Sequence, residues 1–531
     1  MAKTQFQHSR CLSGILITSF ISTIGFAGGF SPKEQEEIQN QLNEFKFNPV
    51  GFMAKPPTKV SGTDQSKLNN APVPSLNRDF SSYKWINSEI DRLAGMQAKN
   101  INSDLRSASS ADFNNASGVS IDAIINPDGT DSPASLVDSL SYQTLRDMEN
   151  ANLMQSALDT HPWSSTYWPV SQGVIAWRYA DPYYPRSSDW NTNVNYVLTH
   201  LNACSLDQLS PAEKYDLLVG DPNQSLTHEM LNEGATFFRS FGTVASWMGI
   251  CHGWSPASYM DARPAHSITV TAADGVTKIP FRPSDIKALS SALWAKGNFQ
   301  SRFIGKRCNQ ENPQTDGMGR IIDPNCYGEN PAAWHLSVVN QIGVGRRSFI
   351  IDAHHDTQIW NQPVFGYKYS YFNPETKYIA PNLEGATVPL QNYTTDQFRS
   401  YRASGAAYVV GVAMDLTYVS ETAPSLSSTD SPEQDALVTV RYLYDLELDA
   451  NQQIIGGEWY SNAHPGFMWT PVKGAKAFSV GDGMLGQSGS QMQWDGSGPI
   501  PSTWFQAIQQ SSAQGQPLER VVSTLEVMAA M

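Results

Sequence analysis

The chain has 531 residues, of which 40% are hydrophobic and 16% are charged, and its formal net charge is −14 at pH 7. A chain of this length can bury a large core, and we expect two or three domains. The acidic balance argues against nucleic acid as a partner, because a nucleic-acid-binding surface carries an excess of lysine and arginine.

The N-terminus predicts a secretory signal peptide over residues 1–27. Lys3 and Arg10 precede an almost uncharged run from Leu12 to Ala27, which ends in the small residues of "GFA". A basic start, an apolar middle and small residues at the cleavage point are the parts of such a signal. No later stretch approaches the twenty apolar residues of a membrane span. We therefore expect a secreted protein, extracellular or periplasmic, without a membrane span.

Four cysteines follow this signal: Cys204, Cys251, Cys308 and Cys326. An even number in an oxidising compartment favours disulfides. Cys308 and Cys326 bound a segment rich in Pro, Gly and Asn. A disulfide there would close a loop of about 19 residues and contribute roughly 3 kcal/mol, so we predict this pair. A Cys204–Cys251 disulfide is the structural alternative to a reactive Cys251.

Residues 28–145 are rich in Ser, Asn, Asp and Ala and poor in aromatic residues. Residues 31–34, "SPKE", form a capping box that predicts the start of a helix. Ile86, Ile90 and Leu93 share one helical face and predict a second helix. Pro-rich and Ser-rich linkers surround these helices. The region is predicted to be a propeptide, an accessory domain or a surface extension.

From Thr160 the sequence becomes dense in aromatic residues, which indicates a well-packed core. A capping box at Ser210–Glu213 predicts a helix that ends at Gly220. Further helices are predicted over Thr227–Ser240 and from a cap at Ser284.

After residue 300 the hydrophobic period shortens towards two, which predicts strands. The predicted strands are "WHLSVVNQI", "SFIIDA", "FGYKYSYF", "AAYVVGVAMDLTYV", "ALVTVRYLYDLEL" and "QIIGGEWYS", the last two joined as a hairpin across Asp449–Asn451. Helices followed by strands predict an α+β fold. We expect a catalytic domain over 146–485, helical to about residue 300 and rich in antiparallel β-structure after it, and a helical tail over 486–531.

The stretch "SWMGICHGW", residues 246–254, surrounds Cys251 with glycines and tryptophans. Only the first turn of a helix tolerates a proline, so a helix containing Pro256 should begin shortly before it. We therefore expect Cys251 in a turn just before that helix. The positive helix end and its free N–H groups could there stabilise a thiolate and an oxyanion. From these residues alone, a nucleophile and a buried or disulfide-bonded cysteine are equally supported.

A thiol nucleophile needs a base and a group that orients the base. His335 begins the predicted strand "HLSVV" and Asp352 ends the next one, so neighbouring strands could join imidazole and carboxylate. Cys, His and then an amide or carboxylate is the chain order of papain-like enzymes. His266, which begins "HSITV", is the competing base, and His252 is predicted to be a polar turn residue because adjacent side chains seldom face one group.

Two other patterns suggest metal sites. His354-His355-Asp356 could bind a metal, but consecutive residues rarely converge on one ion, so a loop at a strand end is favoured. "HEMLN" at 228–232 resembles a zinc-protease helix but has Asn232 where the second histidine belongs. We predict no zinc site there.

Several motifs in order resemble the secreted transglutaminases of the transglutaminase elicitor family. "QIWNQPVFGYKY" at 358–369 is similar to the surface peptide that plants recognise in that family. "LSPAEKYDLLVGD", "GICHGWSPASYM", "FRPSDIKAL" and "LDANQQIIGGEWYSNAHPGFMW" also resemble it. Together these motifs extend from Trp163 to Trp469.

The resemblance implies a calcium-dependent transglutaminase with a papain-like cysteine core. It implies Cys251 as nucleophile, His335 as base and Asp352 as orienting acid. The glutamine that papain-like peptidases carry five residues before the cysteine is absent, so we hypothesise that the indole N–H of Trp247 helps to bind the oxyanion. The calcium ligands are unknown: residues 415–435 offer oxygen donors without the spacing of an EF-hand.

The implied reaction cross-links proteins that expose glutamine and lysine. Cys251 would attack a glutamine carboxamide, ammonia would leave, and a lysine amine would resolve the thioester to an isopeptide bond. Two alternatives stay open. A papain-like peptidase or glutamine deamidase would use the same triad, and a non-catalytic adhesin or elicitor-like module would use Cys251 only structurally.

Overall fold

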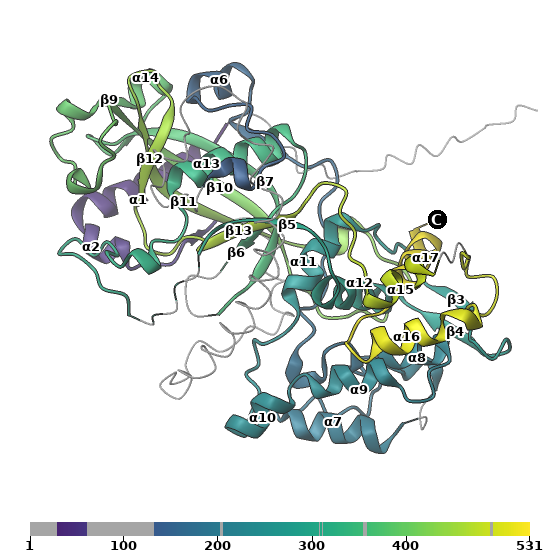
Figure 1. Cartoon of the computed structure of the whole chain (residues 1–531). Coiled ribbons are helices and arrows are strands. Elements are labelled where there is room, and N and C mark those ends of the chain that lie inside the picture. The colour runs from purple at the N-terminus through teal and green to yellow at the C-terminus, as the bar shows by residue number, and fades with distance from the viewer. Residues whose placement is uncertain are drawn as a thin grey trace, which may run out of the picture.

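The computed structural model describes residues 29–60, 132–201, 205–306, 308, 310, 312–353, 358–488 and 492–530. A helical half and a sheet half lie side by side (Figure 1). The α+β prediction is confirmed, since most helices come first and a large antiparallel sheet follows. Within these ranges, none of the helices has the length and apolar character needed to cross a bilayer.

The sheet half is built on one large antiparallel sheet. Its main path runs β1-β11-β10-β7-β6-β13-β5, and β12, β2, β8 and β9 pair at its sides. The long central strands are buried along most of their length because both of their faces are covered. The bounds are β1 Thr58–Lys59, β2 Gln155–Ala157, β5 Ser301–Gly305, β6 Ile350–Asp352, β7 Asn361–Asn373, β8 Tyr378–Ile379, β9 Thr387–Pro389, β10 Tyr408–Ser420, β11 Ala436–Leu448, β12 Ile454–Trp459 and β13 Phe467–Pro471.

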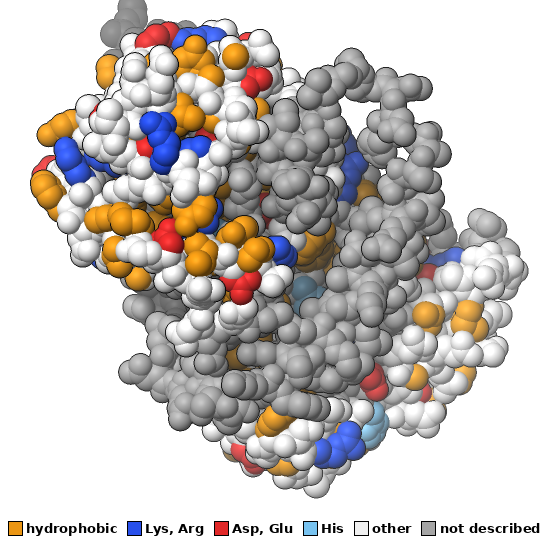
Figure 2. Space-filling model, turned by 60° about the vertical axis from the view of Figure 1, so that its left-hand side comes forward, with side chains coloured by type: hydrophobic (Ala, Val, Ile, Leu, Met, Phe, Trp, Pro, Cys, Tyr) orange, Lys and Arg blue, Asp and Glu red, His pale blue; other side chains and the backbone are white. Residues whose placement is uncertain are grey.

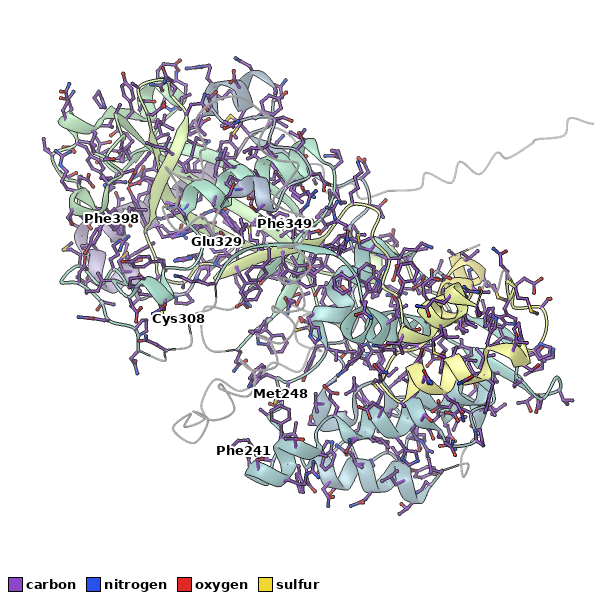
Figure 3. The ribbon with its side chains drawn as sticks, viewed as in Figure 1. Phe241, Met248, Cys308, Glu329, Phe349 and Phe398 are labelled. Atoms are coloured by element: carbon purple, nitrogen blue, oxygen red, sulfur yellow. A yellow bond between two sulfur atoms is a disulfide. The ribbon has the colours of Figure 1, made fainter. Side chains whose placement is uncertain are left out.

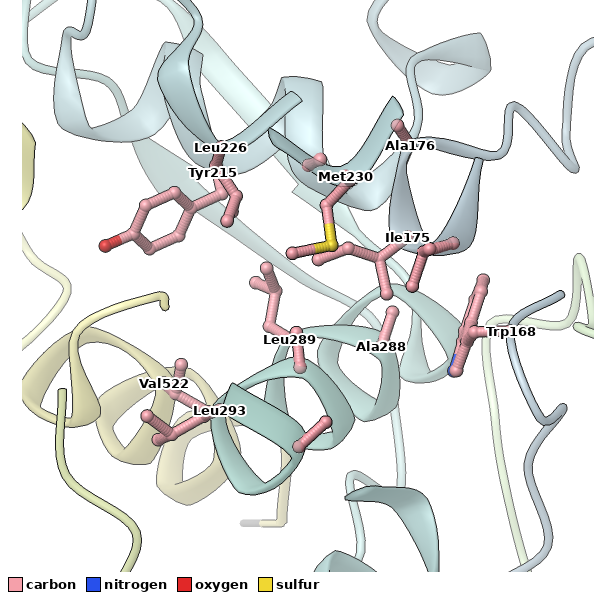
Figure 4. Close-up of a cluster of buried hydrophobic side chains, with 14 of the residues drawn as sticks. Trp168, Ile175, Ala176, Tyr215, Leu226, Met230, Ala288, Leu289, Leu293 and Val522 are labelled. Atoms are coloured by element: carbon pink, nitrogen blue, oxygen red, sulfur yellow. The ribbon is translucent and has the colours of Figure 1, made fainter. Parts of the chain in front are cut away.

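The helical half packs around α12, which is buried along almost its whole length. Tyr215, Leu226 and Met230 cover it from one side and Val522 from another (Figure 4). The C-terminal tail is therefore part of this core. The bounds are α7 Trp190–Thr199, α8 Pro211–Val219, α9 Ser225–Asn232, α10 Ala235–Phe241, α11 Cys251–Met260, α12 Pro283–Lys296, α15 Val480–Gln487, α16 Phe505–Ser512 and α17 Glu519–Ala530, with a hairpin of β3 Ile268–Thr271 and β4 Lys278–Phe281.

The predicted helix over Thr227–Ser240 is two helices, α9 and α10. They part at Gly234, where a Cβ would lie 2.5 Å from the indole nitrogen of Trp190. The capping box at Ser210 and the stop at Gly220 are both confirmed in α8. The cap of the helix predicted from Ser284 lies two residues earlier, because Arg282 is the N-cap of α12 and Pro283 its first residue.

The segment "WHLSVVNQI" forms no strand, contrary to the prediction. It is helix α13 (Pro331–Val338) followed by a π-helical turn (Val339–Val344). Pro331 stands at the first helical position and the Asn330 side chain accepts the N–H of Ala332, so the chain is set for a helix. The helix packs inside the sheet core, with all its residues buried, and therefore shows no polar face to mark its period.

The N-terminal segment is joined to the sheet half. The capping box of Ser31 and Glu34 starts α1 (Pro32–Phe47) as predicted, α2 (Pro49–Met53) follows, and β1 pairs with β11. Ile38, Leu42 and Phe45 pack with Phe372, Phe398, Leu443 and Tyr460 of the sheet half. Residues 29–60 thus complete its core, whereas the helix predicted around Ile90 lies outside the described residues. Short helices α6 (Leu145–Asn150) and α14 (Leu383–Ala386) lie at the edge of this half.

The predicted disulfide between Cys308 and Cys326 is confirmed. Figure 3 places Cys308 at the border of the sheet half. On the face seen in Figure 2, hydrophobic, basic and acidic side chains are interspersed over the described surface. The acidic side chains on the described part of this face are therefore not gathered into one patch.

Candidate active site

Cys251 is the first residue of α11, not a turn residue before the helix as predicted. The segment leading to it passes from Phe241 at the end of α10 through Met248 towards the sheet half (Figure 3). Pro256 lies inside the helix, where it costs one backbone hydrogen bond. The amides of Cys251 and His252 are the first two of the helix, so they have no carbonyl partner within it. The positive end of α11 therefore lies at Cys251.

The two glycines beside Cys251 let this turn lie against other backbone. A Cβ on Gly249 would overlap the carbonyl oxygen of Tyr167, and one on Gly253 would overlap that of Ser291 and lie 2.7 Å from the Cβ of Ala295. Glycine is required at both positions because any side chain would push the turn from its neighbours. The tight packing fixes where the sulfur lies.

The thiol of Cys251 is free and 7% exposed. Its Sγ accepts a hydrogen bond from Nδ2 of Asn361 at 3.3 Å and donates to the carbonyl of Ile359 at 3.7 Å. Burial raises the pKa of Cys251 to about 11, although hydrogen bonds from Asn361 oppose that shift. The resting group is therefore a neutral thiol, and the alternative of a Cys204–Cys251 disulfide is excluded because Cys251 is free. Cys204 itself lies outside the described residues.

Asn361 joins the nucleophile to the sheet half. It is the first residue of β7, and its Oδ1 accepts the indole N–H of Trp469 at 2.8 Å. The hydroxyl oxygen of Ser255 lies 2.6 Å from the carbonyl oxygens of both Cys251 and Asn361. One serine of α11 thus ties the cysteine turn to the start of β7.

Asp352 lies on the strand next to the amide that contacts Cys251. Asp352 ends β6 and is the register partner of Asn361, and its Oδ1 accepts the backbone N–H of Trp360 at 3.0 Å. The carboxylates of Asp352 and Glu421 act on the thiol, since both contribute to raising the pKa of Cys251 after burial. Glu421 accepts Nε2 of Gln362 at 2.7 and 2.8 Å.

The structure does not bring His335 to Cys251. Its Nδ1 lies 2.8 Å from the hydroxyl of Tyr444, and its ring packs on Tyr369 with centroids 4.8 Å apart. Tyr369 is eight residues along β7 from Asn361, a distance of about 26 Å in an extended strand. Full burial lowers the pKa of His335 to about 3. The predicted strand pairing of His335 and Asp352 is wrong, because the histidine belongs to α13.

Among the described residues, no histidine is hydrogen-bonded to Cys251. Burial lowers the pKa of His252 to about 4, with a smaller contribution from Lys296, so its ring is neutral. His266 forms an isolated β-bridge with Thr429, and its backbone N–H donates to the backbone carbonyl of Ala529 in α17. His354, His355 and Asp356 lie outside the described residues.

Trp247 lies in the turn before α11, half-buried against the helical core. No hydrogen bond of its indole N–H falls within the described part of the chain, and its oxyanion role stays a prediction. The amides at the start of α11 are alternative donors.

A calcium site is not supported by the described residues. They contain no group of three or more His, Cys, Asp or Glu side chains arranged to hold a metal ion. In the segment 415–435, Asp430 pairs with Arg263 and Lys287, and Asp435 pairs with Arg263. Asp430 and Asp435 are therefore already neutralised by basic side chains.

Sequence reasoning missed Asn361 and Trp469. Asn361 belongs to "WNQPV", which resembles a surface peptide, yet here the strand β7 lies between β10 and β6 and is mostly buried. One signal could have pointed to Asn361: in papain-like enzymes an amide residue can follow the catalytic cysteine later in the chain. Trp469 lies in the last matching motif and has no such signal.

The chain matches a known protein family over most of its length. The model of the family described as "Transglutaminase elicitor" matches residues 140–487. The crystal structure of the GP42 transglutaminase from Phytophthora sojae is similar at 21% identity and a TM-score of 0.44, covering 70% of this chain and 94% of that chain. No curated protein sequence matches.

Proposed function

Because the chain belongs to the transglutaminase elicitor family, we propose that it is a secreted protein-glutamine γ-glutamyltransferase that works through a thioester on Cys251. One observation carries the proposal. A free thiol stands at the first residue of a helix, within hydrogen-bond reach of the amide of Asn361, whose register partner is Asp352. The helix bearing the cysteine packs on a strand bearing the amide, which supports a papain-like core.

The reaction begins when the thiol loses its proton to a base and the sulfur attacks the side-chain carbonyl carbon of a glutamine. A C–S bond forms, and the oxygen takes the negative charge next to the first amides of α11. The base returns the proton to the amide nitrogen, the C–N bond breaks, and ammonia leaves. A lysine amine then attacks the thioester, a new C–N bond replaces the C–S bond, and the thiol is regenerated. Water in place of the amine would give glutamate.

The base is a histidine that variants must identify. His335 was predicted, but it lies in the sheet core away from the sulfur. The sequence also places His354 and His355 directly after Asp352. Alanine variants of all three, assayed in parallel, identify the base as the one whose loss abolishes transfer in a folded protein.

Amine incorporation into casein is the decisive assay. We expect the wild type to attach a labelled primary amine to casein and Cys251→Ala to attach none. New casein fragments without label would favour the peptidase alternative, and ammonia release without label would favour a deamidase. Equal label with Cys251→Ala would contradict the cysteine mechanism. A wild type without any of these activities would favour the non-catalytic module. Adding a chelator tests the calcium dependence that the resemblance implies.

A further inference from the structure

The orientation of the Asn361 amide is determined by its neighbours. An indole N–H can only donate a hydrogen bond, so the atom of Asn361 that lies 2.8 Å from Nε1 of Trp469 must be the oxygen Oδ1. The NH₂ group must then face the other way, where it lies 3.3 Å from Sγ of Cys251. Trp469 therefore dictates that the sulfur receives a donor.

We propose that Trp469 and Asn361 form a directional hydrogen-bond chain that stabilises the thiolate of Cys251, which makes both of them positioning residues of the reaction. The inference rests on the cysteine chemistry of the proposed function. It adds two residues, one of them on β13, which lies apart from the cysteine turn in the sequence.

The hydrogen-bond chain from Trp469 to Cys251 is buried, and other contacts hold its members in place. Asn361 is 4% exposed and Trp469 is 8% exposed, so water does not replace either bond freely. The backbone carbonyl of Asn361 accepts a hydrogen bond from the hydroxyl of Ser255, and β13 pairs with β5 on one side and β6 on the other. A donor aimed at an anion in a dry site is stronger than the same donor in water.

The same contacts distinguish the two states of the sulfur. As a thiol, Cys251 gives its proton to the carbonyl of Ile359, and the Asn361 amide meets only a weak acceptor. As a thiolate, it loses that bond, and the Asn361 amide meets a full negative charge. The amide thus favours the thiolate and opposes the burial that raises the pKa of Cys251.

The test is the alkylation rate of Cys251 with iodoacetamide from pH 7 to 9, without substrate, followed by mass spectrometry of the Cys251 peptide. Trp469→Phe keeps the ring but frees the amide to turn its oxygen towards the sulfur. We expect alkylation to slow about three- to tenfold at each pH, because the thiolate fraction falls faster than its nucleophilicity rises. Asn361→Asp, which removes the NH₂ donor, should slow it at least as much.

Trp459→Phe is the matched control. Trp459 is 7% exposed, and its indole donates at 2.6 Å to the carbonyl of Glu329, away from Cys251. It should leave the rate unchanged. Should Trp469→Phe unfold, Asn361→Asp alone decides. An alkylation rate equal to wild type in folded variants, equal slowing in Trp459→Phe, or a wild-type thiol that does not react would overturn the inference. Slowing in the variants, in a protein that transfers no amine, keeps the inference and refutes the proposed function.

Discussion

Gly253→Ala tests the close packing that positions the nucleophile. An alanine would ordinarily stabilise a helix by up to about 1 kcal/mol over glycine. Here its Cβ would overlap the Ser291 carbonyl and lie 2.7 Å from the Cβ of Ala295, and backbone cannot rotate away as a side chain can. Overpacking of this kind costs roughly 1–3 kcal/mol and occasionally more. We expect a net loss of about 1–2 kcal/mol, because the clash outweighs the helical preference.

Gly483→Ala is the matched control, since Gly483 lies inside α15 and a Cβ there meets nothing within 4 Å. It should raise the free energy of unfolding by about 0.5–1 kcal/mol. Urea unfolding of both variants, followed by circular dichroism, measures the two signs. Amine incorporation should fall more for Gly253→Ala than its stability loss explains, because α11 must shift and carry Cys251 from Asn361. Equal stability of the two variants would refute the packing argument.

Two further predictions concern buried charges. Arg441→Met leaves Asp415 as a buried, unpaired carboxylate and should lower the free energy of unfolding, measured in urea, by about 3–5 kcal/mol. Lys33→Met, at an exposed pair, should change the free energy of unfolding by less than about 0.5 kcal/mol. Burial raises the pKa of Asp261 to about 6 and that of Glu526 well above its usual range. The stability that these two carboxyl groups contribute should therefore be fully present below about pH 4 and be lost as the pH rises through 6. Glu526→Gln should flatten the dependence of the free energy of unfolding on pH. An unchanged slope in urea unfolding at several pH values would contradict this prediction.

The sheet could be predicted from the sequence wherever a strand was long and its ends were marked. β11 covers the residues of "ALVTVRYLYDLEL", and the turn after it was visible at Asp449. The helix α13 could not be found from periodicity because it is buried on every side, so an apolar run looked like a strand. Only Asn330 and Pro331 marked it as a helix.

The candidate site was predicted in part for the same reason. Glycines mark the turn at Cys251, and Asp352 ends an apolar strand, so the places of both residues in their elements could be inferred from the sequence, while their catalytic roles stay predictions. Asn361 is 110 residues from Cys251, and only the folded chain shows that β7 begins at the sulfur. His335 was misplaced because its position depended on a strand that does not form.

The site is therefore a property of the junction between the halves. The helical half supplies Cys251 and the amides of α11, while the sheet half supplies Asn361, Asp352 and Trp469. The cores of the two halves meet at this junction, where Trp360 and Val419 join the core of the helical half and Tyr259 of α11 packs on the cluster of Ile350, Phe467 and Trp469. A movement of about 1 Å at this junction would break the hydrogen bond of 3.3 Å between Asn361 and the sulfur. Amine incorporation should consequently be lost at a lower urea concentration than secondary structure.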